Sequence, residues 1–474
     1  METAMEQLNN KTIIRARFAP SPTGELHIGG ARTALFSYLF AKNQEGEFLL
    51  RIEDTDRERF VEGATDRIIE SLNWLGIVAD NIDKPMVQSQ RLEIYQKSAE
   101  KLLSEGKAYV CVCSKEDLEA EREAQTKAGH PPKYSGKCRE ANHQISDSPH
   151  VIRMKMPQEG KIVVHDLVRG DVEFDAALQD DQIILKSDGY PTYHLASVVD
   201  DHEMEISHVI RSEEWLSSTP KHIVLYEMLG WQAPEFAHLS MILGPDHSKL
   251  SKRHGATSVI EYKKQGYLPG ALVNFMALLG WNPKDEREMF TLSELAAEFK
   301  LENVNKSGAI FDIEKLNHFN AERLKGLGDE DLKSLLKDFD LNNLSDGQLG
   351  LIRRGGYKTL REAADYIINL EKDPGYDSGL LIFKKSDKEK TLTGLEATSS
   401  KLQAASDWSE ENLQNILASV VAENNLSNGD VFWPVRVALS GQERSPSPIE
   451  LLLAIGKEES MKRVAGAIQK LGQG

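Results

Sequence analysis

Short apolar runs near the start of the chain alternate with a helical pattern, as in a parallel βαβ unit. Residues 11–19 predict a buried strand that runs into a Pro-Ser-Pro-Thr-Gly turn. Residues 31–40 predict a helix, and residues 48–52 predict the next strand. Because two parallel strands joined by a helix form a right-handed crossover, this pattern predicts the first half of a doubly wound parallel sheet in an α/β protein.

The rest of the hydrophobic pattern divides the chain into further parts. Residues 94–193 mix cysteines with short alternating stretches such as 161–165, and they predict an α+β insertion in the sheet. Residues 208–211 predict a strand in the second half of the sheet. Beyond residue 328 the pattern is almost wholly helical, with a predicted break at 373–375. We therefore expect six segments, with these bounds: 1–93, 94–193, 194–243, 244–328, 329–373 and 374–474.

Composition narrows the class of protein. Charged residues make up 28% of the 474 residues and hydrophobic residues 40%, as in ordinary globular proteins. The first ten residues lack the basic and apolar parts of a signal peptide, and the most apolar run, 271–281, is too short to span a bilayer. These features predict a cytoplasmic protein without a membrane partner. The formal net charge of −17 argues against a nucleic-acid binder, although binding depends on a local basic patch rather than on the average charge.

Two short motifs far apart in the chain are candidates for nucleotide chemistry. His27-Ile28-Gly29-Gly30 lies between the predicted strand and helix, where a histidine can donate to a phosphate and the helix dipole attracts one. Lys249-Leu250-Ser251-Lys252-Arg253 offers two lysines to the charge on a leaving pyrophosphate. Alone, the first motif is most often a structural turn and the second a solvated basic turn. The sequence contains no Walker loop and no Gly-x-Gly-x-x-Gly loop that would compete for the nucleotide.

Together, the two motifs resemble the His-Ile-Gly-His and Lys-Met-Ser-Lys-Ser motifs of class I aminoacyl-tRNA synthetases. Gly30 and Arg253 depart from the class pattern, and both departures resemble the bacterial-type glutamyl-tRNA synthetases. The resemblance runs through most of the chain. It implies a glutamate–tRNA ligase that uses ATP and Mg²⁺, binds L-glutamate and tRNA(Glu), and acts as a monomer.

The resemblance also implies a role for each segment. Residues 1–93 and 194–243 would form the two halves of a Rossmann-like catalytic domain. The insertion 94–193 would bind the acceptor end of the transfer RNA, and 244–328 would contact its stem and carry the lysine loop. The last two segments would form helical anticodon-binding sub-bundles: 329–373 and 374–474.

The resemblance further implies two sets of site residues and assigns catalysis to His27, Lys249 and Lys252. The implied ATP site comprises Pro20, Thr23, Gly24, His27, Gly29, Gly30, Glu214, Trp215, Leu250, Ser251 and Lys252. The implied glutamate pocket comprises Arg17, Ala19, Ser21, Glu53, Tyr193, Ser197 and Arg211. Some relatives have asparagine at the position of Ser197.

A glutamate substrate has two carboxylates and one ammonium group, which call for cations and a polar or anionic clamp. The resemblance implies that Arg17 and Tyr193 hold the side-chain carboxylate and that Arg211 holds the α-carboxylate in a fork geometry. Ser21 and Glu53 would take the ammonium group. The competing structural interpretation pairs the arginines with nearby acids instead. Candidates for such pairing are Asp54, Asp56, Glu213 and Glu214.

All three cysteines of the chain lie in one short segment: Cys111, Cys113 and Cys138. With Tyr134 they form a Cys-x-Cys and a Tyr-x3-Cys pattern, which resembles the zinc module of some bacterial glutamyl-tRNA synthetases. Three thiolates suit a structural Zn²⁺, which prefers four tetrahedral ligands. The resemblance implies Tyr134 as the fourth ligand, while Glu140 and His143 remain open alternatives. The structural interpretation is a group of small thiols without a metal.

Transfer-RNA selection and the alternative functions remain open. In relatives that accept only glutamate anticodons, an arginine precedes the aromatic residue of the segment matched by 354–360, where this chain has Gly356. We hypothesise that discrimination is relaxed and that tRNA(Gln) is also charged. The alternatives are a glutaminyl-tRNA synthetase, whose anticodon part is expected to be a β-barrel, a shorter relative that modifies a transfer-RNA base, a smaller nucleotidyltransferase, and an inactive RNA-binding relative. The last is expected to lose His27 or Lys252.

Overall fold

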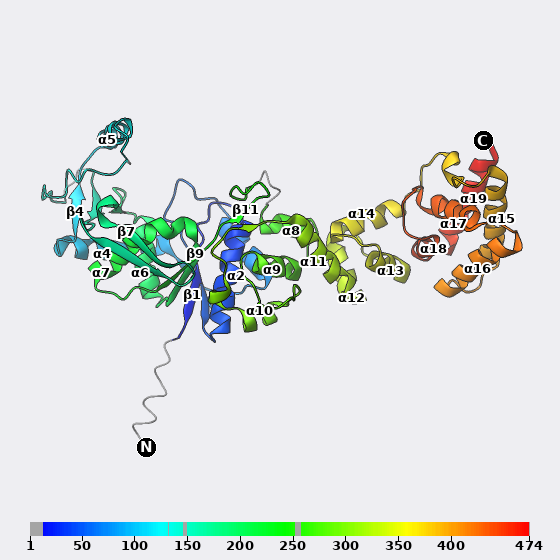
Figure 1. Ribbon diagram of the computed structural model, residues 1–474, viewed down its shortest axis with the longest axis horizontal. Helices are drawn as coiled ribbons and strands as arrows, with labels where there is room; N and C mark the ends of the chain where they lie inside the picture. Colours follow the sequence, from blue (N-terminus) through cyan, green and yellow to red (C-terminus); the bar gives the residue numbers. More distant parts are fainter. Residues whose placement is uncertain (1–12, 131, 146–148, 252–256, 474) are drawn as a thin grey trace, which may run out of the picture. The chain divides into compact units, whose positions relative to one another are not determined.

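In a computed structural model, which describes residues 13–130, 132–145, 149–251 and 257–473, the chain divides into two compact units. The first unit contains the residues up to Tyr262 together with Leu272–Ile313. The second contains Lys263–Ala271 and the residues from Glu314 onwards. Strands and helices alternate in the first unit, whereas the second is helical (Figure 1).

A seven-stranded sheet forms the centre of the first unit. The pairings between its first six strands are parallel, and the hairpin at one edge is antiparallel. This arrangement confirms the predicted doubly wound α/β fold. In spatial order the strands are β3 (Met86–Val87), β2 (Glu47–Ile52), β1 (Arg15–Phe18), β9 (His208–Ser212), β10 (Glu235–Leu239), β6 (Lys161–Asp166) and β7 (Gly170–Asp175).

The central strands are apolar because helices pack against them. Phe48 and Leu50 of β2 are fully buried, as is Ala16 of β1. Helix α2 (Ile28–Asn43) packs against β1, β2 and β9. Among the described residues before position 300, the other α-helices are α3 (Ala64–Leu75), α4 (Leu92–Ser104), α5 (Lys115–Lys127), α6 (Tyr193–Glu203), α7 (Thr219–Leu229), α8 (Val259–Lys264), α9 (Pro269–Leu278) and α10 (Leu292–Glu298).

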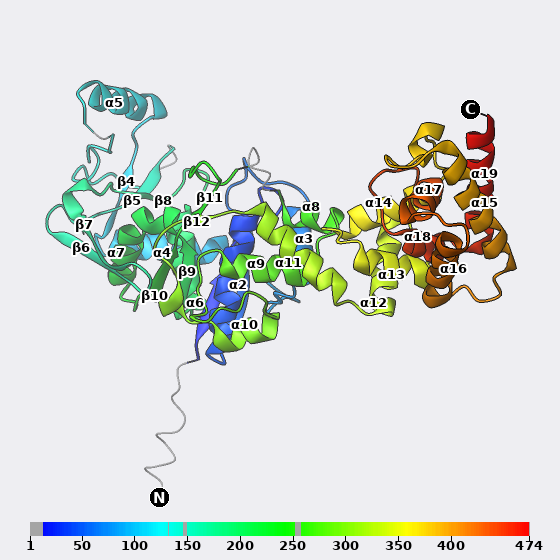
Figure 2. The ribbon, with the colours of Figure 1, turned by 45° about the vertical axis from the view of Figure 1, so that its right-hand side comes forward.

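The segment 94–193 contributes to two sheets. Its hairpin, β6 and β7, extends the central sheet through a parallel pairing of β6 with β10. A separate antiparallel sheet contains β4 (Ala108–Cys111), β5 (Val151–Met154) and β8 (Ile183–Leu185). Helix α5 buries none of its residues, and its Leu118 packs against the cluster that includes Tyr109 and Cys111 of β4 (Figure 2). Two further short strands, β11 (Ile242–Leu243) and β12 (Ala309–Ile310), pair in parallel.

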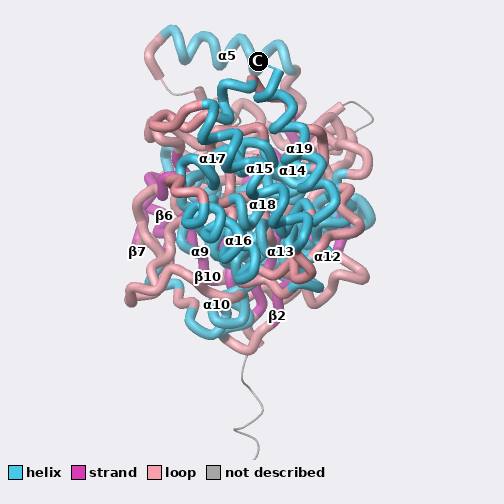
Figure 3. The backbone as a smooth tube through the Cα atoms, turned by 90° about the vertical axis from the view of Figure 1, so that its right-hand side faces the viewer, coloured by secondary structure: helices cyan, strands magenta, loops and turns pink. Residues whose placement is uncertain are grey.

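The second unit confirms the predicted helical region. Residues 314–473, all of which the structure describes, form helices and connecting turns without a strand (Figure 3). This region therefore lacks the β-barrel expected of the glutaminyl alternative. Its helices are α11 (Ile313–Lys325), α12 (Asp329–Leu336), α13 (Asp346–Arg354), α14 (Leu360–Leu370), α15 (Lys388–Ala404), α16 (Glu410–Glu423), α17 (Asn428–Ser440), α18 (Pro448–Ile455) and α19 (Lys457–Gln473). In the described part of the chain, every helix is too short or too polar to cross a membrane.

Candidate active site

The turn between β1 and α2 places His27 at the N-terminus of the helix. His27 Nδ1 accepts a hydrogen bond from Gly30 N at 3.2 Å, so the imidazole caps α2. The helix therefore begins at Ile28 rather than at the predicted Ala31. Because Nδ1 accepts, the proton of the neutral ring lies on Nε2, which can donate to a phosphate. Loss of solvent around the ring, and then the Lys249 ammonium, lower the pKa of His27 and keep the ring neutral at pH 7.

Glycines shape this turn for two different reasons. A Cβ at Gly29 would lie 3.1 Å from Cε1 of His27, so glycine leaves room for the capping ring. Gly24 has a φ of 155°, which residues with a side chain rarely adopt. The carbonyl of Pro20 accepts a hydrogen bond from Glu53 N at 3.0 Å, which ties the turn to the end of β2. The remaining residues of the predicted set in this turn are Ala19, Ser21, Thr23 and Gly30.

The segment that carries the lysine motif returns to the histidine turn. Val259 N donates to Leu26 O at 2.9 Å, and His27 forms an isolated antiparallel β-bridge with Ser258. These contacts come from the stretch that follows the motif. The stretch that follows the lysine motif therefore lies beside the histidine turn in the first unit.

The motif itself is described as far as Ser251. Lys249 forms an ion pair with Glu214, and both side chains are exposed. Leu250 N donates to Ile242 O at 3.0 Å, which holds the start of the motif on β11. Lys252, predicted to be catalytic, lies outside the described residues.

At the carboxyl ends of β1 and β2, two buried arginines share carboxylates. Arg17 donates from Nε and Nη2 to the two oxygens of Asp201, at 2.9 and 3.3 Å. Arg51 donates from Nη1 to Asp201 at 2.6 Å, and from Nη2 to Glu53 at 2.9 Å and Ser197 Oγ at 3.3 Å. Asp201 therefore orients both guanidinium groups.

Electrostatics on this side of the pocket are close to balanced. Burial opposes the charge of Arg51, but Asp201, Glu53 and Asp200 outweigh it and raise the pKa of Arg51. Burial likewise opposes the charge of Asp201, and the two arginines outweigh it and lower its pKa. At Glu53 burial prevails, so its pKa is raised. The carboxylates therefore already neutralise most of the positive charge here.

Arg211, near the end of β9, lies among neutral groups instead. Its Nε donates to His238 Nε2 at 3.0 Å, and its Nη1 donates to the Tyr193 hydroxyl at 2.5 Å. Its Nη2 donates to Thr219 Oγ1 at 2.8 Å and to the Trp215 carbonyl at 3.3 Å. The residue is 6% exposed, and no carboxylate of the described chain forms an ion pair with it. Its positive charge is therefore buried without a counter-ion.

The acids considered as partners for Arg17 and Arg211 have other contacts. Asp54 accepts from Ser89, and Asp56 pairs with Arg59. Glu213 and Glu214 pair with Arg169 and Lys249. Arg211 therefore does not pair with an acid as the competing structural interpretation expected, whereas Arg17 does pair with one, Asp201, which is not among the four candidates.

Sequence reasoning missed several buried polar residues that surround the pocket. Arg51 is an arginine within an apolar strand, and Asp200-Asp201 are consecutive acids directly after two valines. These were the available signals, because a fully buried charge needs a partner. His238 gave no signal, since a single histidine in a short strand is common.

The three cysteines converge with Tyr134. Their Sγ atoms lie within 4.8 Å of one another, with Cys113 and Cys138 3.5 Å apart. Tyr134 Oη lies 3.5 Å from the Sγ atoms of both Cys111 and Cys113. The Arg153 guanidinium lies 4.0 Å from the centre of the Tyr134 ring. Three thiols and a phenol around one point fit a four-ligand zinc site.

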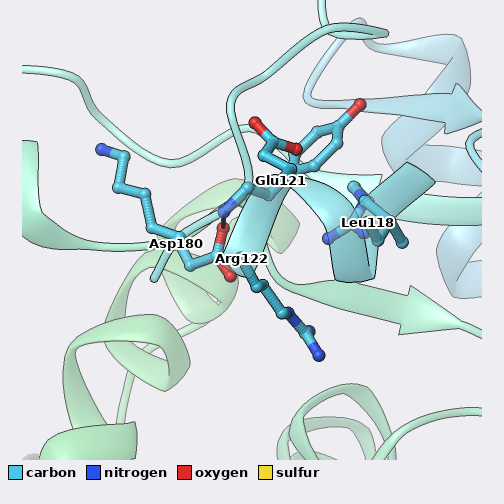
Figure 4. Close-up of a pocket in the computed structure, with 7 residues that line it drawn as sticks. Leu118, Glu121, Arg122 and Asp180 are labelled. Atoms are coloured by element: carbon cyan, nitrogen blue, oxygen red, sulfur yellow. Dashed lines mark hydrogen bonds between the residues drawn. The ribbon is translucent and has the colours of Figure 1, made fainter. Parts of the chain in front are cut away.

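The alternative fourth ligands point elsewhere. The side chain of Glu140 is 82% exposed and lies 3.8 Å from Arg139 Nε. His143 is exposed. A small pocket lies beside Tyr134, where Leu118, Glu121 and Arg122 of α5 approach Asp180 (Figure 4).

Comparisons with known proteins agree with this geometry. Residues 13–318 match the family described as tRNA synthetases class I (E and Q), catalytic domain, and residues 313–468 match the anticodon binding domain. A glutamate–tRNA ligase of Dehalococcoides mccartyi is 46% identical over 478 residues, which cover 97% of this chain and 98% of the relative. The chain belongs to the glutamate–tRNA ligase family. This confirms the family predicted from the two motifs.

Other members of the glutamate–tRNA ligase family match over similar lengths. Glutamate–tRNA ligase 2 of Thermoanaerobacter pseudethanolicus is 45% identical over 96% of this chain and 98% of its own length. The crystal structure of a glutamate–tRNA ligase from Elizabethkingia meningosepticum, in complex with its amino acid, has a TM-score of 0.85 at 34% identity. It covers 97% of this chain and 99% of its own. The catalytic and anticodon parts of a glutamate–tRNA ligase are therefore both present.

Proposed function

We propose that this glutamate–tRNA ligase activates L-glutamate with ATP and transfers it to the 3′ end of tRNA(Glu). One observation carries the proposal: Arg17 and Arg211 of the expected glutamate pocket lie on neighbouring strands and are held by separate partners, and the histidine turn that follows β1 contacts the stretch after the lysine motif. The pocket suits a dicarboxylic amino acid, and the turn suits the phosphates of ATP. Family membership gives the same activity.

In the first step the α-carboxylate of glutamate attacks the α-phosphate of ATP, and pyrophosphate leaves. The enzyme forms no covalent bond, so catalysis consists of positioning and charge neutralisation. His27 Nε2 donates to a phosphate, while Lys249 and Lys252 meet the charge on the pyrophosphate. Mg²⁺ bound with ATP supplies further positive charge there. In the second step a terminal 2′-hydroxyl of the transfer RNA attacks the acyl carbon of the mixed anhydride, so that an ester forms as the acyl–phosphate bond breaks and AMP leaves.

The charges of the two arginines explain how glutamate is recognised. Arg17 is oriented by Asp201 and takes the side-chain carboxylate, whereas Arg211 takes the α-carboxylate. Its four contacts occupy at most four of the five guanidinium N–H groups. A two-point grip by Arg211 therefore requires Tyr193 or the Trp215 carbonyl to release an N–H group. Glu53 and Ser21 hold the ammonium group.

We further propose the six predicted segments as functional domains. The segment 94–193 binds the acceptor end, and the helical residues 329–474 bind the anticodon. The match of 313–468 to an anticodon binding domain supports the latter. We also propose that the enzyme is a cytoplasmic monomer. Light scattering of the purified protein tests its oligomeric state.

The cysteine cluster is proposed to hold one structural Zn²⁺ through Cys111, Cys113, Cys138 and Tyr134. The convergence of four donor atoms supports this ligand set. Elemental analysis should find about one zinc per chain. Cys113→Ser should lose the metal, whereas His143→Gln should retain it. If His143→Gln lost its zinc, His143 rather than Tyr134 would be the fourth ligand.

Charging of tRNA(Gln) remains a proposal. Gly356 has a φ of 68°, a left-handed conformation in which an arginine would be strained. The loop after α13 is therefore built for glycine, and it lacks the arginine expected of strict relatives. Aminoacylation of both transfer RNAs with glutamate tests this proposal. Strict rejection of tRNA(Gln) would overturn it.

The proposed activity is tested by ATP–pyrophosphate exchange with each amino acid, with and without transfer RNA. Of the amino acids tested, only glutamate should support exchange. Lys252→Ala should lower the rate of adenylate formation about a hundredfold or more, as for loss of one transition-state donor. Glutamate affinity should change little in this variant. An unchanged rate would remove Lys252 from the mechanism.

A further inference from the structure

Three neighbouring strands of the central sheet each contribute one polar residue to a single chain of contacts. Arg211 of β9 and His238 of β10 are register partners in the parallel pairing of these strands. Asp166 is the last residue of β6, which pairs with β10 on its other side. All three residues are buried, and His238 is completely inaccessible to solvent. Carboxyl ends of parallel strands are where ligands bind in such sheets.

The hydrogen bonds of His238 determine where its proton lies. A guanidinium can only donate, so His238 Nε2, 3.0 Å from Arg211 Nε, must accept. The ring proton therefore lies on Nδ1 and is donated to Asp166 Oδ2 at 2.6 Å. If Nε2 carried the proton instead, its N–H group would face the N–H group of Arg211 Nε, and no hydrogen bond could form between them. Arg211 and Asp166 thus select the same neutral tautomer from opposite sides.

Main-chain groups hold the Asp166 carboxylate in addition to the imidazole. Its Oδ1 accepts from Val168 N at 3.0 Å and from Arg169 N at 2.8 Å, and its Oδ2 also accepts from the main-chain nitrogen of His238 at 3.0 Å. These bonds, with the one from the ring, outweigh burial and lower the pKa of Asp166. The carboxylate is therefore ionised and immobile.

A direct ion pair between Asp166 and Arg211 would neutralise the guanidinium. The imidazole between them prevents this contact while still fixing the direction of Nε. Arg17 shows the contrasting arrangement, since Asp201 contacts it directly. Arg211 is therefore held in place by a carboxylate that does not neutralise it.

We propose that His238 and Asp166 are positioning residues for glutamate activation, which hold Arg211 in place and leave its charge available for the α-carboxylate of the substrate. This inference rests on the proposed role of Arg211 in glutamate binding. It adds two residues that never touch the substrate. Their effect should appear in the use of glutamate and not in the use of ATP.

Two substitutions at His238 separate its two contacts. The amide of His238→Gln reaches the position of Nε2 and can accept from Arg211. The amide of His238→Asn reaches the position of Nδ1 and can donate to Asp166, but it leaves Arg211 Nε without an acceptor. His208→Gln is the matched control, since His208 lies on β9 and its ring packs on Phe40 and, among the described residues, hydrogen-bonds only to Ser207.

The experiment is ATP–pyrophosphate exchange with transfer RNA, in which KM for glutamate, KM for ATP and kcat are measured for each variant. We expect His238→Asn to raise the glutamate KM about tenfold or more, as for a lost hydrogen bond to a charged group. His238→Gln and His208→Gln should stay within about threefold of the wild type on the same scale. The ATP KM should change in none of them.

Other outcomes overturn the inference. These are equal effects of the two His238 variants, a larger effect of Gln than of Asn, an equal rise in the ATP KM, or no effect at all. If the wild-type enzyme shows no exchange with glutamate, the proposed function fails instead. Should the variants fail to fold, neutron diffraction of the wild-type protein is decisive. A deuteron on Nε2 of His238 would contradict the inference, and one on Nδ1 alone would support it.

Discussion

At the ends of β1 and β2, the guanidinium groups of Arg17 and Arg51 lie against carboxylates. At the end of β9, the guanidinium of Arg211 is buried among a phenol, a hydroxyl, an imidazole and a carbonyl. Buried charges are costly without partners, so the two arrangements serve different purposes. On the first side the acids of the protein pair with both arginines and stabilise the fold, and Arg17 is to meet the side-chain carboxylate of the substrate while it remains on Asp201. On the second, the missing negative charge is one that a substrate carboxylate can supply.

The two sides of the pocket also differ in their other titratable groups. Carboxylates contact Arg51, whereas one imidazole, His238, contacts Arg211 and two more, His194 and His222, lie near enough to feel its charge. Burial lowers the pKa of His222, and the charge of Arg211 lowers it further. Burial also lowers the pKa of His194, to about 3. The histidines near Arg211 therefore remain neutral at pH 7 and do not add to its uncompensated charge.

The largest expected effect is on the carboxylate side. Arg51→Met removes the shared partner of Asp201 and Glu53, which leaves Glu53 without its cation and Asp201 with Arg17 alone. We expect a loss of about 3–5 kcal/mol in the free energy of unfolding, measured by chemical denaturation. Arg59→Met is the control, because Arg59 pairs with Asp56 at the surface and should contribute at most about 1 kcal/mol. If both variants lost the same free energy of unfolding, the buried pairs of Arg51 would contribute no more to stability than the surface pair of Arg59, which would contradict this account.

Arg211→Gln should have the opposite profile. No carboxylate is orphaned, so the free energy of unfolding should fall by much less than in Arg51→Met. The kcat/KM for glutamate in pyrophosphate exchange should fall about a hundredfold or more, because charge-assisted hydrogen bonds to the α-carboxylate are lost. Exchange kinetics and denaturation of the same preparation provide both numbers. A variant that remains fully active would refute the assignment of Arg211.

The smallest expected effect is on the free energy of unfolding at acidic pH. Because the folded-state pKa of His194 is about 3, its contribution to stability is complete above the unfolded-state pKa of about 6.5. That contribution declines as the pH falls from 6.5 towards 3, by about 2 kcal/mol at pH 5. His194→Gln should therefore reduce the loss of unfolding free energy between pH 7 and 5. A loss in His194→Gln as large as in the wild type would contradict the account.

The sequence predicted the parts of this molecule that depend on local patterns. The strands at 48–52 and 208–211 and the helix after the histidine turn follow from apolar runs and periodicity. The start of α2 was predicted too late, because two glycines disfavour a helix and the cap supplied by His27 overrides that preference. The two motifs indicated the family, since their residue types are those that phosphate chemistry needs.

The remaining features depend on contacts between distant segments. The pairing of β6 with β10 joins Asp166 to Phe236, and nothing in either strand specifies its partner. Asp201 reaches Arg17 only because α6 packs beside the sheet, so the acid named from sequence proximity was wrong. The neutral surroundings of Arg211 likewise arise from elements far apart in the chain. Local patterns therefore located the pocket but not its charge balance.

The most direct test is a crystal structure of the enzyme with glutamate and a non-hydrolysable ATP analogue. The account predicts that the α-carboxylate lies within hydrogen-bond distance of the Arg211 guanidinium, with His238 still in contact with Nε. The side-chain carboxylate should lie against Arg17, which remains on Asp201. A glutamate bound with its α-carboxylate away from Arg211, or an Arg211 that turns to a carboxylate of the protein, would contradict the account.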